Sequence, residues 1–336
     1  MSLLGEPAVT LPVIFAGLLG LSILLYVILD GFDLGVGILL PLANDDEKDR
    51  MIASIGPFWD ANETWLVLGI GILLVAFPVA HGVILTALYL PVAIMLVGII
   101  LRGVAFEFRM KAPIERKEFW NRAFFAGSLI TALSQGFMLG LYIVGLQYTF
   151  AHVAFALITA LCVAAGYAFI GATWLIHKTD GILQRLSINW ARFCLVGSAI
   201  GLALVSLVTP LVSERIFNKW FSVPEILLLA PLPIISALLL AGLWIALRYV
   251  STFANGWDWA PFACAVALFT TAFTGLAYSF YPYIVPEKLT IYEAASAPES
   301  LTIILFGVLF VMPVILAYTA LAYLIFRGKA TTLRYD

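Results

Sequence analysis

Long apolar stretches alternate along the chain with short polar connections. Nine of these stretches are close to the roughly 20 residues that an α-helix needs to cross a hydrocarbon core about 30 Å thick. The pattern therefore predicts nine membrane-spanning helices, at Leu11–Leu29, Phe58–Val79, Val83–Leu101, Ala123–Leu146, Ala151–Ile176, Phe193–Val212, Ile226–Leu247, Ala260–Tyr281 and Leu301–Phe326. Because no connection is long enough for a separate soluble domain, we expect residues 1–336 to form one all-α transmembrane domain.

The composition supports a membrane protein. Hydrophobic residues make up 63% of the 336 residues and charged residues only 11%, whereas charged residues approach a quarter of an ordinary soluble domain. The first ten residues lack the basic segment of a signal peptide, so the first span is expected to stay in the protein. A formal net charge of -2 gives no indication of nucleic-acid binding.

The basic residues predict the orientation. Nine spans place the termini on opposite sides, and fifteen of the eighteen Lys and Arg residues fall on the C-terminal side, within 48–50, 102–122, 178–192 and 327–334 and at 248. The other side holds only Arg215, Lys219 and Lys288. Because basic residues accumulate in cytoplasmic loops, we expect the C-terminus in the cytoplasm and the N-terminus outside.

Two acidic blocks interrupt the apolar pattern, at Asp30–Gly37 and Phe58–Trp65. A carboxylate at membrane depth costs about 2.5–3.5 kcal/mol on insertion scales, and such residues usually mark an ion or proton route. The function should therefore be sought at the four acids of these blocks, which are Asp30, Asp33, Asp60 and Glu63.

The second block lies at a predicted helix start, because Pro57 suits the first turn of a helix. This register places Asp60 at the cytoplasmic edge of the hydrocarbon and Glu63 about 4.5 Å deeper on roughly the same face. Two carboxylates that step into the membrane form a candidate proton relay. The alternative is that Asp60 only favours the positive helix end, which contributes about 0.3–1 kcal/mol.

The register of the first block stays open, because the apolar stretch from Leu11 to Ala43 is too long for a single crossing. Asp30 lies either at the inner interface or several residues inside it. Asp33 shares its helix face, and the nearby glycines leave room for another helix or for water. Plain interfacial placement is the alternative here too.

Three Gly-x-x-x-Gly pairs indicate close helix packing, a spacing that lets two helix backbones approach each other. They are Gly31/Gly35, Gly136/Gly140 and Gly197/Gly201.

Ligands for a haem or a structural metal are not evident in the sequence. A b-type haem needs axial histidines, or histidine with methionine, that project from helices. The histidines lie instead at the ends of predicted spans, at His81, His152 and His177. The cysteines lie inside apolar stretches without C-x-x-C spacing, at Cys162, Cys194 and Cys264. We therefore expect no haem, metal site or disulfide in this chain, and no catalytic residue of its own.

Four blocks in a fixed order resemble subunit II of the cytochrome bd quinol oxidases, with a further likeness to the cyanide-insensitive branch. They are Asp30–Gly37, Trp59–Leu66, Arg102–Arg109 and Tyr281–Ser300, spread over nearly the whole chain.

The resemblance implies two four-helix bundles plus one peripheral helix in a bacterial inner membrane. It implies a heterodimer with a subunit I that carries two b haems, haem d and the quinol-oxidising loop, with room for a small additional subunit. Such oxidases reduce oxygen to water with cytoplasmic protons. The acid matching Asp60 is assigned in the family to the entrance of a proton path toward haem d, with acids matching Asp30 and Asp33 nearby. Glu63 stands where some relatives have an uncharged residue.

Three functions thus remain open at this level. The leading hypothesis is a non-haem subunit that stabilises subunit I and contributes to proton uptake. The first alternative is a proton-coupled transporter that uses the same acids and acts without a haem-bearing partner. The second is an assembly scaffold in which the acids serve helix packing. Some family members also hold a quinone in this subunit, but no such site can be located from the sequence.

Overall fold

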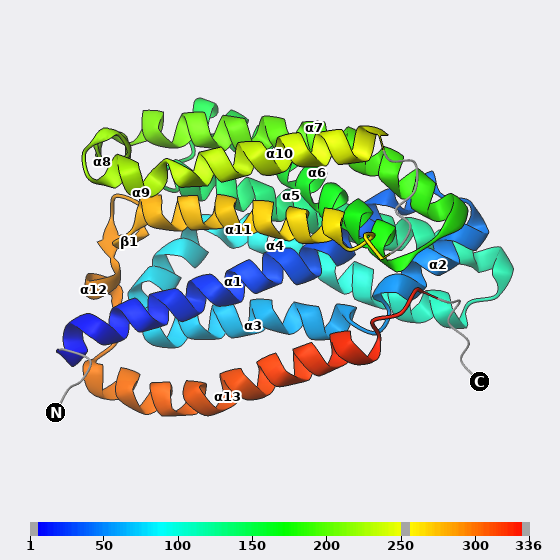
Figure 1. Ribbon diagram of the computed structural model, residues 1–336. Coiled ribbons are helices and arrows are strands. Elements are labelled where there is room, and N and C mark those ends of the chain that lie inside the picture. Colours follow the sequence, from blue (N-terminus) through cyan, green and yellow to red (C-terminus); the bar gives the residue numbers. More distant parts are fainter. Residues whose placement is uncertain (1–5, 250–255, 331–336) are drawn as a thin grey trace.

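The computed structural model describes residues 6–249 and 256–330. Within these residues, nine helices are long and apolar enough to cross a membrane, as the sequence predicts. They run side by side along one axis of the molecule (Figure 1). These helices are α1 (Pro7–Leu39), α3 (Trp59–Ala76), α4 (Pro78–Lys111), α5 (Ile114–Ile143), α6 (Phe150–Lys178), α7 (Gly181–Val212), α10 (Pro231–Tyr249), α11 (Ala260–Phe280) and α13 (Pro298–Ile325).

Short elements cap the two ends of this array. The 3₁₀ turn η1 (Leu40–Leu42) and helix α2 (Asp45–Ile55) follow α1 at one end. At the opposite end, Figure 1 shows the other short elements. They are α8 (Glu214–Phe221), α9 (Glu225–Leu229), the antiparallel pair β1 (Tyr283–Val285) and β2 (Leu289–Thr290), and α12 (Ile291–Ala294).

Several helices extend beyond the predicted spans. Helix α4 runs on to Lys111 and α5 begins at Ile114, so the prediction of a connecting loop over residues 102–122 was wrong. Arg, Lys and Glu are good helix formers, and a helix that leaves the hydrocarbon loses nothing by continuing into water. The second span ends earlier than predicted, at Ala76, because Pro78 starts α4.

Helix α6 is the centre of the packing, and all three predicted glycine pairs contact it. A Cβ atom added to Gly35 would lie 1.8 Å from the backbone oxygen of Tyr167. On α5, a Cβ on Gly140 would lie 2.5 Å from the Cα of Ala156. On α7, a Cβ on Gly201 would lie 2.5 Å from a Cys162 carbon. The pairs therefore let α1, α5 and α7 approach α6 within this chain.

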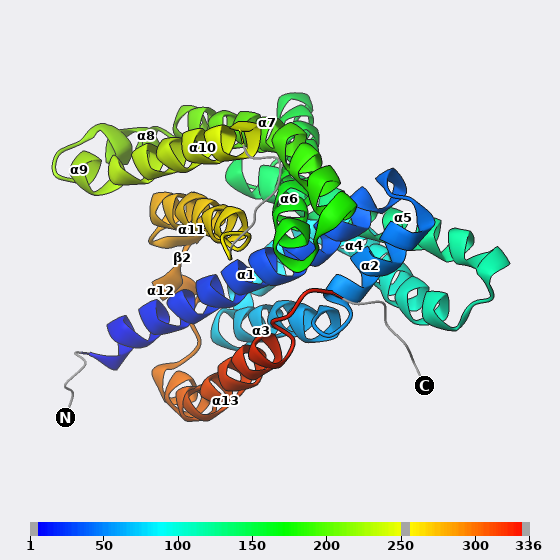
Figure 2. The same ribbon diagram turned by 45° about the vertical axis from the view of Figure 1, so that its right-hand side comes forward.

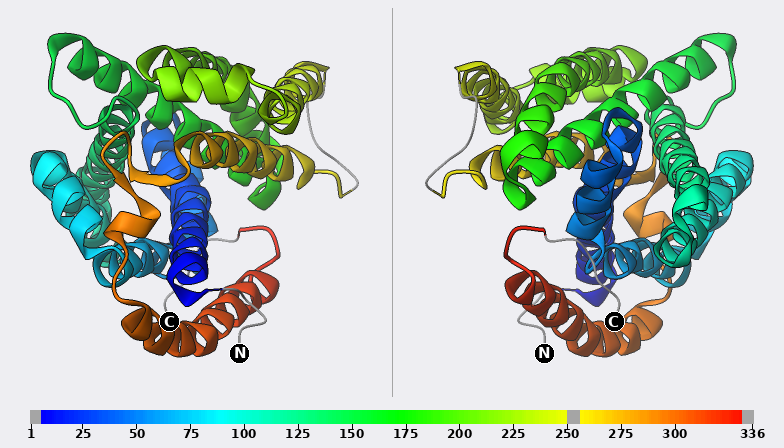
Figure 3. Two further views of the ribbon diagram at one scale, coloured as in Figure 1. Left: turned by 90° about the vertical axis from the view of Figure 1, so that its left-hand side faces the viewer. Right: turned by 90° about the vertical axis from the view of Figure 1, so that its right-hand side faces the viewer.

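Burial separates central from peripheral helices. In the most apolar 18-residue stretch of α5 and of α6, half of the residues are buried, whereas in that of α13 only 11% are. Figure 2 and the two end views of Figure 3 place α13 at the margin of the molecule. The grouping of the other helices into two four-helix bundles stays a prediction.

Candidate functional site

The first acidic block lies inside helix α1. This helix continues to Leu39, so Asp30 stands nine residues, or about 13 Å, before its end. The side chains of Asp30 and Asp33 are both fully buried. The close contact of Gly35 with α6 brings a second helix against this block. Both acids therefore lie well inside the helix, while their depth relative to the membrane interface stays a prediction.

A buried arginine joins the two acidic blocks. Arg102 is only 1% exposed, and its Nη2 donates a hydrogen bond to Asp30 Oδ1 at 2.6 Å. The same nitrogen donates to Glu63 Oε1 on α3. The position of Arg102 follows from packing, because a Cβ on Gly127 of α5 would lie 2.7 Å from the Arg102 backbone nitrogen. Helices α1 and α3 therefore each bring a carboxylate to one guanidinium of α4.

An asparagine makes the second connection between the blocks. Asn62 is fully buried, and its Nδ2 donates to Asp33 Oδ2 at 2.8 Å and to the Leu29 carbonyl at 3.2 Å. Its Oδ1 accepts a hydrogen bond at 3.0 Å from the Tyr323 hydroxyl of α13. The inner cluster, as we name it, consists of Asp30, Asp33, Asn62, Glu63 and Arg102.

Several polar atoms of the inner cluster are buried without a hydrogen-bond partner among the residues that the structure describes. They are Asp30 Oδ2, Asp33 Oδ1, and Nε and Nη1 of Arg102. An unsatisfied buried polar group costs about 1–3 kcal/mol, and more when it is charged. The cluster also holds three carboxyl groups against one guanidinium. It is therefore a place where buried water would find several polar atoms to bind.

Asp60 stands apart from the inner cluster. It is exposed and makes no hydrogen bond or ion pair within the described part of the chain. It lies one turn before Glu63 on α3, which corresponds to about 4.5 Å along the helix. The Glu63 side chain is 23% exposed, between the buried Asp30 and the exposed Asp60. Burial of the carboxylates therefore increases stepwise from Asp60 through Glu63 to Asp30.

A second polar chain begins beside the inner cluster. The Tyr167 hydroxyl donates to Gln135 Oε1 at 2.6 Å, and Gln135 Nε2 donates to the Tyr26 hydroxyl at 2.6 Å. Tyr26 lies on α1 one turn before Asp30. Hydrogen-bonding groups therefore extend from the cluster toward α5 and α6.

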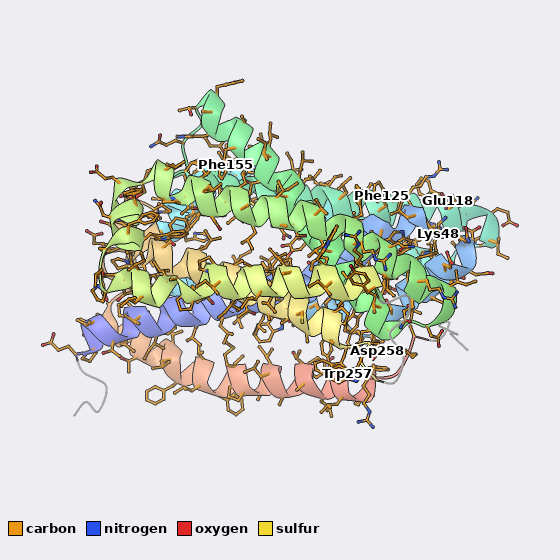
Figure 4. The ribbon with its side chains drawn as sticks, turned by 45° about the horizontal axis from the view of Figure 1, so that its top comes forward. Lys48, Glu118, Phe125, Phe155, Trp257 and Asp258 are labelled. Atoms are coloured by element: carbon orange, nitrogen blue, oxygen red, sulfur yellow. The ribbon has the colours of Figure 1, made fainter. Side chains whose placement is uncertain are left out.

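A separate ionic group ties α2 to α4 and α5. The outer network, as we name it, consists of Lys48, Asp49, Arg109, Lys117, Glu118 and Asn121. Arg109 Nη2 donates to Asp49 Oδ1 at 2.6 Å, and Lys117 lies 3.2 Å from the other Asp49 oxygen. Lys48 contacts Glu118 at 3.0 Å, and Figure 4 shows these two side chains together at the α2 end of the molecule.

The carboxyl of Asp49 is shifted by these contacts. Burial alone would raise its pKa, but the hydrogen bonds and charges of Arg109 and Lys117 outweigh burial and hold the pKa below the usual 3.8. Arg109 and Lys117 therefore both contact an ionised Asp49 carboxylate.

Comparison with known proteins places the chain in a family. The sequence model of the family described as cytochrome bd terminal oxidase subunit II matches residues 11–326. The chain belongs to this family.

Relatives agree over nearly their whole length. The chain is 27% identical to the cytochrome bd ubiquinol oxidase subunit 2 of Bacillus subtilis, over 90% of this chain and 92% of the relative. It is 25% identical to the cytochrome bd-I ubiquinol oxidase subunit 2 of Escherichia coli strain K12, over 94% and 93%. A solved structure, that of bd oxidase from Geobacillus thermodenitrificans, shares the fold, with a TM-score of 0.75, 18% identity, and coverage of 95% of this chain and 100% of that one.

Family membership favours a quinol oxidase subunit over a transporter, and both the proton path and the assembly scaffold are compatible with it. A subunit II of a cytochrome bd oxidase is part of an oxidoreductase of the respiratory chain, a quinol oxidase, and not a free-standing transporter. The nine apolar helices make this subunit a multi-pass membrane protein.

Sequence reasoning found the four acids of this subunit II but not their partners. Assigning Arg102 to a cytoplasmic loop was wrong, since it is buried in α4 and paired with two carboxylates. A hydropathy pattern ends a span at an arginine, because it cannot show whether an acid on another helix compensates the charge. The signal available was Asn62 directly before Glu63 in the second acidic block, and Arg102 directly after the apolar residues of the third predicted span.

The histidines of the subunit lie where the sequence predicts. His81 and His152 are in the first turns of α4 and α6, and His177 is in the last turn of α6. Within residues 6–249 and 256–330, no three His, Cys, Asp or Glu side chains are grouped in a way that could hold a metal ion. The three cysteines are free.

Proposed function

We propose that this subunit takes up protons from the cytoplasm and passes them toward the oxygen-reducing haem of subunit I in a quinol oxidase. The observation that carries the proposal is the inner cluster with its neighbour Asp60. The Asp60 carboxylate is exposed, that of Glu63 is partly buried, and that of Asp30 is fully buried in a cluster with more carboxyl groups than cations. Intramembrane acids of this kind mark proton routes.

Each residue has a distinct role in this proposal. Asp60 collects protons at the surface, and Glu63 relays them inward. Arg102 holds Glu63 and Asp30 together and contributes the one positive charge of a cluster with three carboxyl groups. Asn62 keeps Asp33 oriented toward α3. Water at the unpartnered oxygens of Asp30 and Asp33 would complete the route to the partner subunit.

The orientation belongs to the same proposal. We place the α2 end of the molecule in the cytoplasm, with the N-terminus outside, and residues 1–336 as a single domain. Withdrawing Arg102 from the count of loop residues leaves a large excess of Lys and Arg at this end, and the excess supports a cytoplasmic location. Asp60 then faces the cytoplasm, from which oxygen reduction draws its protons.

The partners follow from the family. We propose a heterodimer with a haem-bearing subunit I, in which this chain also has a stabilising role, with quinol and oxygen as substrates of the complex. The Bacillus and Escherichia relatives are named as ubiquinol oxidases. A small additional subunit and a quinone bound to this chain stay predictions.

Proton uptake can be tested in the purified complex. Asp60→Asn removes the entrance carboxylate, whereas Glu115→Gln removes another exposed carboxylate, in the first turn of α5 at the same end of the molecule. We expect Asp60→Asn to lower quinol oxidase turnover at least tenfold and to slow proton uptake in reconstituted vesicles. Glu115→Gln should leave both unchanged.

The haem spectrum separates a proton path from a scaffold. Haem content should stay at the wild-type level in Asp60→Asn, because this side chain contacts no described group that holds the fold. Full turnover of Asp60→Asn with intact haems would refute the proton path. A parallel loss of haem and of complex abundance would instead support a scaffold role for the acid.

A further inference from the structure

An apolar groove runs between α7 and α10 on the outside of the helix array. These two helices lie side by side along one edge of the molecule (Figures 1 and 2). The groove has a volume of about 420 Å³, within the roughly 300–1,000 Å³ of ligand pockets. Its walls include Val196, Ala199 and Ile200 of α7 and Ala241, Trp244 and Ile245 of α10.

The groove is shaped for a chain of methylene groups. Ala199 and Ala241 face it from opposite helices and leave the space open, while Trp244 and Ile245 stay exposed beside it. No wall residue carries a charge. A ligand here would therefore gain affinity from apolar contact along its length and not from polar recognition.

One end of the groove is bordered by an arginine that connects the two helices. Arg192 lies one turn before Val196 on α7. Its Nε donates to the Leu247 carbonyl and its Nη2 to the Arg248 carbonyl, at 3.3 Å for the latter. These carbonyls belong to the last turn of α10, where the helix dipole is negative. The Arg192 side chain thus fixes the spacing of α7 and α10 at this end.

Two more arginines lie on the same faces as the groove. On α7, Arg185 precedes Arg192 by seven residues, which is about two turns. On α10, Arg248 follows Trp244 by one turn. Both side chains are exposed and neither forms an ion pair with a residue that the structure describes. Neither helix contains an Asp or a Glu.

The charge around this end is otherwise compensated. Asp180, which precedes α7, pairs with Arg50 of α2 at 2.6 Å. Asp258, before α11, pairs with Lys329. Among the residues that the structure describes, Arg185 and Arg248 are therefore exposed arginines without an ion pair on the two helices that form the groove, at the end of the molecule where α2 lies.

We propose that this groove binds an anionic glycerophospholipid of the surrounding membrane. One acyl chain lies between α7 and α10, and the phosphate is held by Arg185 and Arg248 at the mouth. The charge complementarity selects an anionic headgroup over a neutral one, because basic pockets between spanning helices bind anionic lipids. A quinone shares the apolar tail but has no negative charge to pair with the arginines. Only the assignment to the cytoplasmic leaflet rests on the proposed orientation.

The size of the effect follows from membrane electrostatics. Each arginine near an anionic surface contributes about 1 kcal/mol, which is about fivefold in affinity. Loss of both exposed arginines should therefore weaken binding about 10- to 30-fold. Filling the groove should weaken it independently of charge.

The test is a titration of the purified two-subunit complex with phosphatidylglycerol, read by native mass spectrometry. The double variant R185Q/R248Q should raise the apparent Kd about 10- to 30-fold. The variant A199L/A241L keeps both charges but fills the groove, and should lower occupancy to a similar extent. R116Q removes an exposed arginine on α5 at the same end and should bind as the wild type does.

Other outcomes decide against the proposal. Equal binding of phosphatidylcholine, or displacement of the lipid by a quinone at equal concentration, would overturn the anionic headgroup. Unchanged affinity in either double variant would overturn the site. The variant R185K/R248K is the control for misfolding. It changes the same two residues but keeps their charges, so it should retain most of the affinity. Proton uptake through Asp60 is measured separately, so failure here leaves the proton path untouched.

Discussion

The inner cluster and the outer network contain the same kinds of side chain and differ in charge balance. Helix α4 contributes an arginine to each, Arg102 and Arg109, seven residues apart and thus on about the same face. In the outer network each Asp49 oxygen has a cationic partner, and Lys48 contacts Glu118. In the inner cluster one guanidinium contacts two carboxylates and the third carboxylate accepts from Asn62. Four buried polar atoms of the cluster lack a partner among the described residues.

Under the proposed function, this difference separates a structural role from a functional one. A balanced network near water links helices at little cost, because solvent compensates imperfect contacts. An unbalanced cluster between helices is expensive to maintain, so its persistence indicates a use that needs uncompensated charge. Proton transfer is such a use, since a proton can compensate the charge and then leave.

The largest expected effect is at the two arginines. Arg102→Gln leaves Asp30 and Glu63 without their cation and should destabilise the subunit by about 3–5 kcal/mol. Arg109→Gln removes hydrogen bonds to a partly exposed carboxylate and should cost about 1–3 kcal/mol. Thermal unfolding and the abundance of the assembled complex measure both. Equal losses would remove the distinction between the two regions.

The next effect concerns the backbone contact that supports the inner cluster. In Gly35→Ala the new Cβ would lie 1.8 Å from the Tyr167 carbonyl oxygen, so α1 must move away from α6. The cost should reach or exceed the roughly 1–3 kcal/mol of an overpacked core. Gly71→Ala is the control, since a Cβ there meets nothing within 4 Å. Because Ala has the higher helix propensity, Gly71→Ala should be neutral or slightly stabilising, and a matching loss in both variants would exclude the contact with Tyr167 as the cause.

Removal of a single inner charge should affect turnover more than stability. Asp33→Asn keeps an oxygen that can accept from Asn62 and takes one negative charge from an overcharged site. The melting temperature should therefore stay the same or rise, while quinol oxidase turnover falls several-fold. The corresponding outer variant, Asp49→Asn, should leave turnover at the wild-type level. A lower melting temperature without loss of turnover in Asp33→Asn would reverse the roles assigned to the two regions.

The smallest effect is a pH dependence of the outer network. Because the pKa of Asp49 is lowered below 3.8 in the folded protein, its contribution to stability is present above that value and is lost as the pH falls through the folded pKa. Asp49 is 36% exposed, so the contribution should be below about 1 kcal/mol. The difference in melting temperature between wild type and Asp49→Asn should shrink as the pH drops from 5 to 3. A constant difference would exclude Asp49 ionisation as its source.

Much of the helical array could be predicted because membrane spans have a local cause. Each needs about 20 apolar residues, and each predicted stretch overlaps a helix of the structure. The helix ends were predicted poorly where polar helix formers continue a span, as between residues 102 and 122. The short helix α2 follows from its own cap, in which Asn44 and Glu47 form a capping box, but hydropathy alone does not indicate it.

The candidate site was predictable in its acids and not in their arrangement. Asp30, Asp33 and Glu63 were expected from the cost of charge in an apolar span, and the structure brings these three together. Asp60, expected in the same group, lies at the surface with no partner in the described structure. Arg102 was assigned to the wrong environment, because its compensating charges come from residues 72 and 39 positions away.

The sequence by itself determined the class of this protein: a nine-span membrane subunit with acids in its first two spans, related to cytochrome bd oxidases. Those features depend on residue types and on the order of neighbouring residues, which can be read directly from the sequence. Only the tertiary structure decided that the two acidic blocks meet, that one arginine joins them, and that Asp60 remains outside. Such facts depend on which helix faces which, and the glycine contacts that fix those faces link residues far apart in the chain.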